Sequence, residues 1–317
     1  MAGATFHAGE LALQRRYGSA ETLAEVGPRI IRDRMPAQHR MFFGQLPFVV
    51  LGALDADGQT WAGALAGRPG FMSSPHERQL DIAALPPLAD PLHAALVPGA
   101  PVGLLGLEPH TRRRNRLNGT LLSVGAGGFS MQVGQSFGNC PKYIQARRPT
   151  YVAGSSAKPV MHTSKGLDEA ALRTIANADT FFIATAHPQA ATAAAPERGV
   201  DVSHRGGKPG FVRVQGQTLT VPDYLGNFFF NTLGNLALNP RCGLLFIDFD
   251  TGGLLQLAAH AELVLEGAEL ESFAGAQRLL RLHVLACRRM DAALPLRWGP
   301  AELSPSLADT GAWQQQP

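Results

Sequence analysis

Cysteine is scarce in this chain and long apolar runs are absent. The three cysteines among its 317 residues stand far apart, at positions 140, 242 and 287, with no Cys-x-x-Cys pair and no His-x-x-His partner. This spacing argues against a zinc site and a disulfide framework, and it indicates a reducing cytoplasm. No window holds about 18 consecutive apolar residues, and the first residues lack the apolar run of a signal peptide. We therefore expect a cytoplasmic protein without membrane association.

Charge is also sparse. Charged residues make up 17% of the sequence, hydrophobic residues 45%, and the formal net charge is +3. This composition is typical of a folded globular protein and excludes a disordered chain. The one dense basic run, RRRNR at 112–116, has no aromatic residues interleaved for base stacking, so we expect a solvated hairpin tip and no nucleic-acid partner. No Ser-His-Asp or paired-carboxylate arrangement supports hydrolysis.

The sequence contains a repeat. A shift of 140 residues places GRPGF (67–71) on GKPGF (207–211), and it also places the Gly-Leu-Leu stretch 103–105 on 243–245. The segment between these blocks has the same length in both copies. Equal spacing across two blocks is not expected of unrelated β-hairpins. We therefore predict two copies of one domain.

Each copy reads mainly as strands. Residues 46–65 and 243–264 each place apolar strands around an Asp- or Gly-containing turn, which predicts hairpins. Between them, 227–238 has helical spacing, with Asn227 or Asn231 as the cap and Asn239-Pro240 as the end. Strands around short helices favour a small antiparallel barrel in each copy. The expected order is an N-terminal helical segment (1–40), a first barrel with a post-barrel helix (41–150), a linker with a helix (151–178), a second barrel (179–300) and a tail (301–317).

Only the second copy carries polar groups at its repeated turn. Ser203, His204 and Arg205 stand where the first copy has the stretch Gly-Ala-Leu at 63–65, and Lys208 follows. Glycines beside them allow close approach of a ligand to the backbone, and an arginine fork matches phosphate oxygens. A solvated basic loop is the alternative interpretation.

The same asymmetry recurs at two further elements. Asn227, Asn231 and Thr232 lie at the start of the predicted helix, where the dipole favours an anion. Gln256 interrupts an otherwise apolar strand, where a buried amide needs hydrogen-bond partners. The first copy has Pro87, Pro91 and Arg116 at the positions of Asn227, Asn231 and Gln256. We therefore expect one working site, in the second copy, and one that has decayed.

The second copy resembles the FMN-binding split barrel of the pyridoxamine 5′-phosphate oxidase-like superfamily. The resemblance rests on the stretches DVSHRGGKPGFV, then GN, then NPRCGLLFIDFDTGGLLQL. The resemblance implies a mainly β protein, with two tandem split β-barrels and flanking helices forming an intrachain pseudo-dimer. It implies noncovalent FMN held by Ser203, His204, Arg205, Lys208, Gly226, Asn227, Asn231, Thr232 and Gln256. Asn231-Thr232 replaces the Arg-Lys of the better-known oxidases, and their C-terminal Arg-x-His has no counterpart here, so vitamin oxidation itself is not expected.

A second stretch, QSFGNCPKYIQARR at 135–148, is similar to a Phe-x-x-Cys-x-Lys element that follows the barrel in related flavin proteins. The resemblance implies that this element reaches the flavin held by the other barrel. It contributes the candidates Gln135, Ser136, Asn139, Cys140 and Lys142. We expect a helix here with Asn139 as its N-cap. Cys140 is either a reactive thiol beside Lys142 or a small packed residue.

These observations predict an FMN-dependent oxidoreductase acting on a small molecule, with NAD(P)H as a candidate electron donor. The cofactor would perform the chemistry, and the sequence offers no metal site and no evident catalytic acid or base. A flavin carrier without turnover and a haem-binding split barrel are the alternatives. A second copy of the chain is a candidate partner.

Overall fold

The repeated Pro-Gly-Phe turn has the same backbone in both places in the computed structural model, which describes residues 4–153 and 160–313. Phe71 N–H donates to the Arg68 carbonyl and Phe211 N–H to the Lys208 carbonyl, each at 2.9 Å. Gly70 and Gly210 have φ of 96° and 85°. Such values favour glycine, which explains why both copies keep Pro-Gly at this point.

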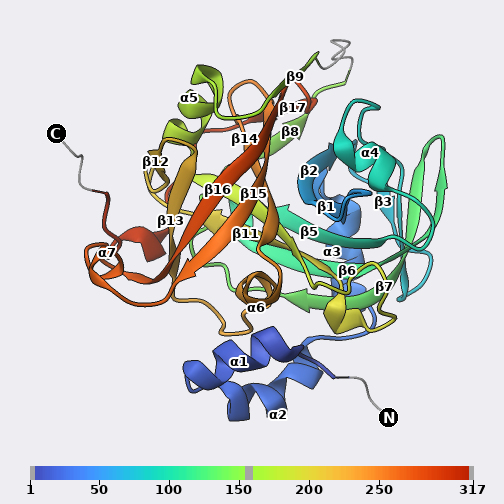
Figure 1. The fold of residues 1–317 in the computed structure, drawn as a ribbon. Coiled ribbons are helices and arrows are strands. Elements are labelled where there is room, and N and C mark those ends of the chain that lie inside the picture. Colours follow the sequence, from blue (N-terminus) through green and yellow to red (C-terminus); the bar gives the residue numbers. More distant parts are fainter. Residues whose placement is uncertain (1–3, 154–159, 314–317) are drawn as a thin grey trace.

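The strands form two antiparallel sheets of matching topology (Figure 1). The first has the order β2-β1-β5-β6-β7-β4-β3 and the second β11-β10-β14-β15-β16-β13-β12, so the two orders correspond strand for strand. The first sheet comprises β1 (Phe48–Leu54), β2 (Thr60–Ala66), β3 (Met72–Ser73), β4 (Gln79–Ile82), β5 (Pro101–Glu108), β6 (Arg113–Gly125) and β7 (Gly128–Gly138). The second comprises β10 (Thr180–Ala186), β11 (Val200–Gly206), β12 (Arg213–Gln215), β13 (Thr218–Tyr224), β14 (Arg241–Ile247), β15 (Leu254–Val264) and β16 (Ala276–Asp291).

The predicted fold class is therefore confirmed: the chain is mainly β, with two sheets of one topology in tandem. Among the described residues the end strands of each order do not pair, so neither sheet forms a closed barrel. An additional strand, β9 (Val160–Ser164), comes from the expected linker and pairs with β16. Two short strands, β8 (Pro149–Tyr151) and β17 (Leu296–Trp298), pair with each other after the two sheets.

The two sheets pack against each other about a pseudo-twofold axis. Gly52 pairs with Gly103, and Ala184 pairs with Gly243, so Gly52 and Ala184 are equivalent positions of β1 and β10. A Cβ at Gly52 would lie only 2.8 Å from the Cβ of Ala184. Residues of both sheets, including Phe182 of β10, form one shared apolar cluster there. Val202 Cγ2 would lie equally close, so the axis has no room for a side chain at Gly52.

Glycines bring the outer strands equally close. A Cβ on Gly103 would lie 2.7 Å from the Val200 carbonyl of β11, and one on Gly243 would lie 2.6 Å from the Thr60 carbonyl of β2. These are the same contact made twice, since Gly103 corresponds to Gly243 and β2 to β11. The interface is thus self-complementary, like that of a twofold dimer.

Helices cover the ends of the sheets. In chain order they are α1 (Ala8–Arg16), α2 (Ala20–Ile30), α3 (Ala37–Gln45), α4 (Pro91–Ala95), α5 (Glu169–Asn177), α6 (Asn231–Leu238) and α7 (Ala268–Glu271). Figure 1 shows α1 and α2 beneath α6, a helix of the second copy, although they precede the first. Gly9 of α1 and Gly234 of α6 let these two helices touch: a Cβ on Gly234 would lie 2.6 Å from Glu10 Cγ. No helix in the described part of the chain is long and apolar enough to cross a membrane.

Neither predicted cap residue caps the helix. α6 begins at Asn231, one residue after its N-cap Phe230, whose φ of 62° is left-handed and which makes no side-chain cap bond. The Asn227 side chain instead accepts a hydrogen bond from Phe229 N–H at 3.2 Å. Asn239 ends the helix, as expected. The first turn of α6 is therefore not capped by a side chain.

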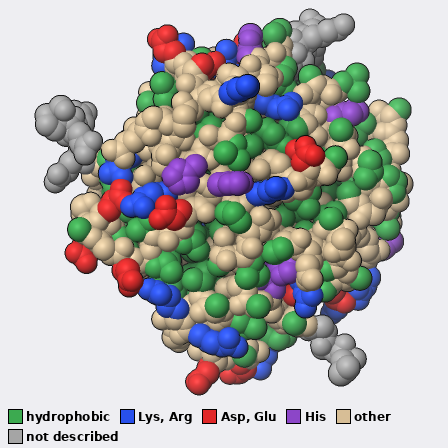
Figure 2. Space-filling view, viewed as in Figure 1, with side chains coloured by type: hydrophobic (Ala, Val, Ile, Leu, Met, Phe, Trp, Pro, Cys, Tyr) green, Lys and Arg blue, Asp and Glu red, His purple; other side chains and the backbone are tan. Residues whose placement is uncertain are grey.

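Charges of both signs are interspersed on the face of the molecule drawn in Figure 2. Several exposed charges pair within one helix, as Arg29 does with Glu25 and Arg173 with Glu169. Exposed pairs of this kind contribute little to stability. The charges with structural consequence are the buried ones described below.

The crowded axis predicts a compensating pair of substitutions. Gly52→Ala should lower the free energy of unfolding by about 1–3 kcal/mol, because its methyl group would lie 2.8 Å from both Ala184 Cβ and Val202 Cγ2. Adding Ala184→Gly removes one of these two contacts and should restore part of the loss. Chemical denaturation of the two variants measures both effects.

Gly125→Ala is the control, since no atom lies within 4 Å of the added methyl group. The packing about the axis would be refuted if the second substitution worsened the first.

Candidate functional site

A pocket lies between β11, the connection from β13 to α6, and the segment that follows β7. It brings together residues more than 90 positions apart, including Asn139 and Asn231. The predicted residues that line it are Ser203, His204, Arg205, Gly226, Asn227, Asn231, Thr232, Asn139, Cys140 and Lys142. Ser203, His204 and Arg205 belong to strand β11 itself, and the turn begins only after Gly206.

Four predicted residues lie elsewhere. The Lys208 ammonium donates to the Thr310 carbonyl at 2.8 Å, so the C-terminal segment holds it away from the pocket. Gln135 and Ser136 are still inside strand β7, where Gln135 accepts from Asn118 and Ser136 Oγ lies 2.8 Å from His39 Nδ1. Gln256 Nε2 donates to the Ala62 carbonyl at 3.0 Å, across the interface, in the first copy.

The expected helix after β7 is also absent from the described residues. The pocket-lining part of this segment, 139–143, is irregular, so Asn139 caps no helix. Its Oδ1 atom is buried without a hydrogen-bond partner. The segment runs on to β8 and carries Asn139, Cys140 and Lys142 past the pocket as an extended strap.

The prediction of a solvated tip at 112–116 was wrong for Arg114 and Arg116. Strand β6 begins at Arg113, and alternation along it places Arg114 and Arg116 on one face, both lining the pocket. Arg116 is 8% exposed. Arg116 and Gln256 are equivalent by the repeat, since they pair with Leu105 and Leu245. Each crosses the interface to the other copy, so the second copy's pocket receives Arg116 and not Gln256.

Arg116 is fixed by a buried network at the pocket wall. Its Nη1 lies 2.8 Å from Asp201 Oδ2 and donates to Asn231 Oδ1 at 3.0 Å, and its Nη2 donates to Ser203 Oγ. Asn231 Nδ2 in turn donates to Glu10 Oε1 at 2.5 Å. The N-terminal helix α1 thus supports the pocket from behind.

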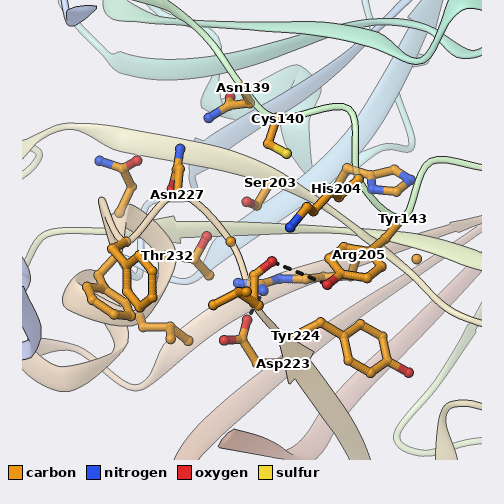
Figure 3. A pocket seen from close by; sticks show the side chains of 18 of the residues that line it. Asn139, Cys140, Tyr143, Ser203, His204, Arg205, Asp223, Tyr224, Asn227 and Thr232 are labelled. Atoms are coloured by element: carbon orange, nitrogen blue, oxygen red, sulfur yellow. Dashed lines mark hydrogen bonds and ion pairs between the residues drawn. The ribbon is translucent and has the colours of Figure 1, made fainter. Parts of the chain in front are cut away.

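A second carboxylate orients two further guanidinium groups. Asp223 pairs with Arg205 through one oxygen and accepts from Arg278 Nε at 2.8 Å through the other. Figure 3 shows Asp223 pointing toward Arg205, with Tyr143 and Tyr224 to one side. Asp223, Arg278 and the two tyrosines were not predicted from the sequence, because nothing in their local pattern distinguishes them from ordinary strand and loop residues.

Positive charge exceeds negative charge in this pocket. Its lining has five cationic side chains and one carboxylate, Asp223; the cations are Arg114, Arg116, Lys142, Arg205 and Arg278. Burial and the neighbouring Arg116 and Arg205 lower the pKa of Arg114. Burial, followed by Arg114 and Arg205, lowers the pKa of His204 well below its usual value, so His204 is neutral at pH 7. The arrangement favours an anionic ligand.

Several buried donors and acceptors of the lining have no partner within the protein. They are both ring nitrogens of His204, Nε of Arg205 and of Arg116, Nη1 of Arg278, Oγ1 of Thr232 and Oδ1 of Asn139. Buried polar groups without partners are rare and costly in folded proteins. Their concentration here indicates that a ligand completes the site.

Backbone conformation gives the same indication. Tyr143, Phe228 and Phe230 line the pocket and have left-handed φ of 65°, 59° and 62°. Such values are unfavourable for residues with a side chain and cluster at ligand sites. The N-terminus of α6, without a side-chain cap, also opens here through Asn231 and Thr232. Its free N–H groups and dipole favour a phosphate or carboxylate.

The interior of the pocket measures about 110 Å³. This is room for about four water molecules. It suits a phosphate group with the first atoms of the chain that bears it, and a larger ligand has to extend through the mouth. The charge, the donors and the size thus agree on the phosphate end of a phosphate ester.

The equivalent place in the first copy is filled. A Cβ on Gly63 would lie 2.5 Å from Leu92 Cδ1 and 3.1 Å from Gln256 Nε2. Asp90 caps α4 and accepts from Gln256, and burial raises the pKa of Asp90. Side chains of the protein thus occupy the space that the second copy leaves open.

Cys140 lines the pocket and is partly exposed, while Cys242 and Cys287 are buried in the second sheet. Burial raises the pKa of both buried thiols, to about 12 for Cys242. Arg114 Nε donates to the Cys140 carbonyl at 2.9 Å, which fixes the strap at this residue. The described residues contain no cluster of His, Cys, Asp and Glu that could hold a metal ion.

Comparisons with known proteins return structures of low overall similarity. HupZ of Group A Streptococcus is 16% identical, covering 37% of this chain and 89% of its own, with a TM-score of 0.28. A protein assigned as a pyridoxamine 5′-phosphate oxidase from Lactobacillus delbrueckii is 13% identical, covering 39% and 94%, with a TM-score of 0.30. An FAD-binding protein from Mesorhizobium loti is 10% identical, covering 41% and 98%, with a TM-score of 0.27. No family model and no curated protein sequence matches the chain.

Glu10 behind the pocket predicts a specific pH dependence. Burial raises its pKa from 4.5 to about 8. The folded state then binds a proton that the unfolded state has released, so the free energy of unfolding should fall as the pH rises toward 8. The slope from this group is at most about 1.4 kcal/mol per pH unit. Glu10→Gln should flatten the profile, measured by urea denaturation at a series of pH values.

The window for this test is pH 6.5 to 8. Burial lowers the pKa of the neighbouring His7 to about 4, which makes stability rise with pH below 6.5 and opposes the Glu10 effect there. Parallel profiles of the wild type and the variant between pH 6.5 and 8 would contradict a buried, protonated Glu10.

Proposed function

We propose that the pocket binds the phosphate end of FMN and that the protein is an FMN-dependent oxidoreductase acting on a small molecule. The observation that carries the proposal is the surplus of oriented, partly unsatisfied cationic groups at a helix N-terminus, at the very residues that resemble the FMN-binding split barrel. Phosphate monoesters are recognised by such combinations of guanidinium groups and backbone amides.

The residues divide into phosphate-binding and ring-binding groups. Arg116, Arg205, Ser203 and Thr232, with the first amides of α6, would hold the phosphate. The rings of Tyr143 and Tyr224 pack with centroids 4.9 Å apart and form an aromatic wall of the pocket. A planar ring system stacks favourably on such a wall.

FMN supplies hydride and electron transfer when bound. The chain's own residues orient the ligand and exclude water. Neutral His204 can donate from one ring nitrogen and accept at the other without adding charge. Asp223 keeps Arg205 and Arg278 in place, so the ligand meets preorganised donors. NAD(P)H is the proposed electron donor, and the enzyme is related in this proposal to pyridoxamine 5′-phosphate oxidase.

The first experiment is the absorption spectrum and mass of the small molecule that copurifies with the protein. A two-band flavin spectrum with the mass of FMN supports the proposal, and a Soret band would redirect it to haem.

Phosphate dependence is the sharper prediction. FMN should bind much more tightly than riboflavin, which lacks the phosphate. Arg205→Ala should weaken FMN binding by about 1.5–3 kcal/mol, or roughly 10- to 150-fold, the value of a charge-assisted hydrogen bond. Riboflavin binding should hardly change. Fluorescence titration of both ligands measures this difference.

Lys208→Ala is the matched control. It also removes a cation, three positions after Arg205, but this cation lies outside the pocket. Equal affinity for FMN and riboflavin would overturn the assignment of the phosphate site.

Turnover separates an enzyme from a flavin carrier. NADH or NADPH should bleach the FMN-loaded protein anaerobically, and an added acceptor such as a quinone should restore the colour. Stopped-flow absorbance measures both phases. A flavin that stays oxidised with both nucleotides would favour the carrier.

A further inference from the structure

A second cavity, of about 720 Å³, lies beside α5, the turn between β14 and β15, and the segment after β17. It shares no lining residue with the proposed FMN pocket. The strap after β7 connects the two, since Asn139 to Tyr143 line the first and Arg147 lines the second. A volume of this size is typical of small-molecule sites.

A buried ion pair forms part of the cavity wall. Arg147 and Asp179 pair with each other and are 6% and 8% exposed. Arg147 also stacks on Phe249, with its guanidinium carbon 3.6 Å from the ring centroid. Nε and Nη1 of Arg147 and Oδ1 of Asp179 have no hydrogen-bond partner. A buried pair left incomplete in this way costs stability.

The other half of the molecule shows that the fold does not require this pair. In the β8–β17 pair, Leu296 lies opposite Tyr151 and Trp298 lies opposite Pro149. A twofold axis through this pair makes Leu296 equivalent to Pro149 and Trp298 equivalent to Tyr151. Arg147 is therefore equivalent to Leu294. Asp179 corresponds to Pro47, since their carbonyls accept from the equivalent Gly207 and Gly67 amides. The two equivalent positions on the other side of the twofold axis are therefore apolar, and Leu294 there is buried. That side of the molecule forms without a charged pair.

The lining indicates the chemistry of a ligand. Phe249 and Trp298 supply aromatic walls, with ring centroids 4.9 Å apart, and Trp298 Nε1 also has no partner. Unsatisfied donors of Arg147 thus stand beside an unsatisfied acceptor of Asp179. Three arginines and four aspartates line the cavity, so no surplus of positive charge attracts an anion, in contrast to the FMN pocket.

We propose that this cavity binds a neutral, planar aromatic molecule with an amide-type edge, in which a C=O group adjoins an N–H group. The carbonyl oxygen accepts from Arg147 or Trp298, the N–H donates to Asp179, and the ring packs on Phe249 and Trp298. Small aromatic amides and lactams, nucleobases among them, belong to this class. The proposal does not depend on FMN binding.

Three matched probe molecules test whether the cavity recognises the amide-type edge of a ligand. Benzamide offers both an acceptor and a donor, acetophenone only the acceptor, and benzoate two acceptors with a negative charge. Ligand-observed NMR titration of the full-length protein should give saturable binding of benzamide that is about tenfold tighter than that of the other two, the value of one hydrogen bond to a charged group. No saturable binding of benzamide, or equal binding of all three, overturns the proposal.

Two variants locate the binding. Arg147→Leu/Asp179→Leu removes both charges together, as at the equivalent positions Leu294 and Pro47, and should weaken benzamide binding about tenfold or more. Trp298→Phe keeps an aromatic wall without the Nε1 donor and should weaken it less. The melting temperature and the far-UV circular dichroism spectrum report whether each variant is folded. Unchanged benzamide affinity in the folded double variant places the ligand elsewhere and refutes the assignment.

Discussion

Close contact between the two sheets is the constraint on which the rest of the structure depends. Three glycines, at positions 52, 103 and 243, remove side chains where the sheets meet, and at the axis Ala184 and Val202 fill the space beside Gly52. This proximity lets a strand of one copy reach the edge strand of the other. Arg116 leaves β6 and hydrogen-bonds to Ser203 of β11, and Gln256 leaves β15 and hydrogen-bonds to Ala62 of β2.

The two equivalent places at the interface differ: one is filled by side chains of the protein and the other is open. In the first copy Leu92, Asp90 and Gln256 fill the space and satisfy one another apart from one amide oxygen. In the second copy the space stays open, with crowded cations, unsatisfied donors and left-handed backbone around it. Such features lower stability, and a folded chain keeps them where a ligand or a reaction uses them. The comparison between the halves is informative because it holds the fold constant.

That comparison extends beyond the pocket beside β11. Arg147 and Asp179, at a separate cavity, are replaced by Leu294 and Pro47 at the equivalent positions across the twofold axis. The strap after β7 lines both cavities, and His204 in the first is affected electrostatically by Arg147 near the second. The two open cavities thus lie along one segment, the strap after β7. The first copy supports the pocket of the second copy and donates Arg116 to it.

Local sequence patterns determined the repeat, the strand content, the Pro-Gly turns and ten of the residues that line the pocket. Ser203, His204, Arg205, Asn227 and the strap residues Asn139 to Lys142 differ visibly from their counterparts or belong to a recognisable stretch. Only the tertiary structure decided which strand residue enters which pocket. Because the copies pack about a twofold axis, Arg116 of the first copy enters the pocket of the second, and Gln256 of the second enters the equivalent place in the first. The residues next to each of them in the sequence do not indicate which copy the side chain contacts. For the same reason the sequence could not show that Lys208 is held by the C-terminal segment, that Glu10 supports Asn231, or that Asp223 orients two arginines: each depends on contacts between residues far apart in the chain.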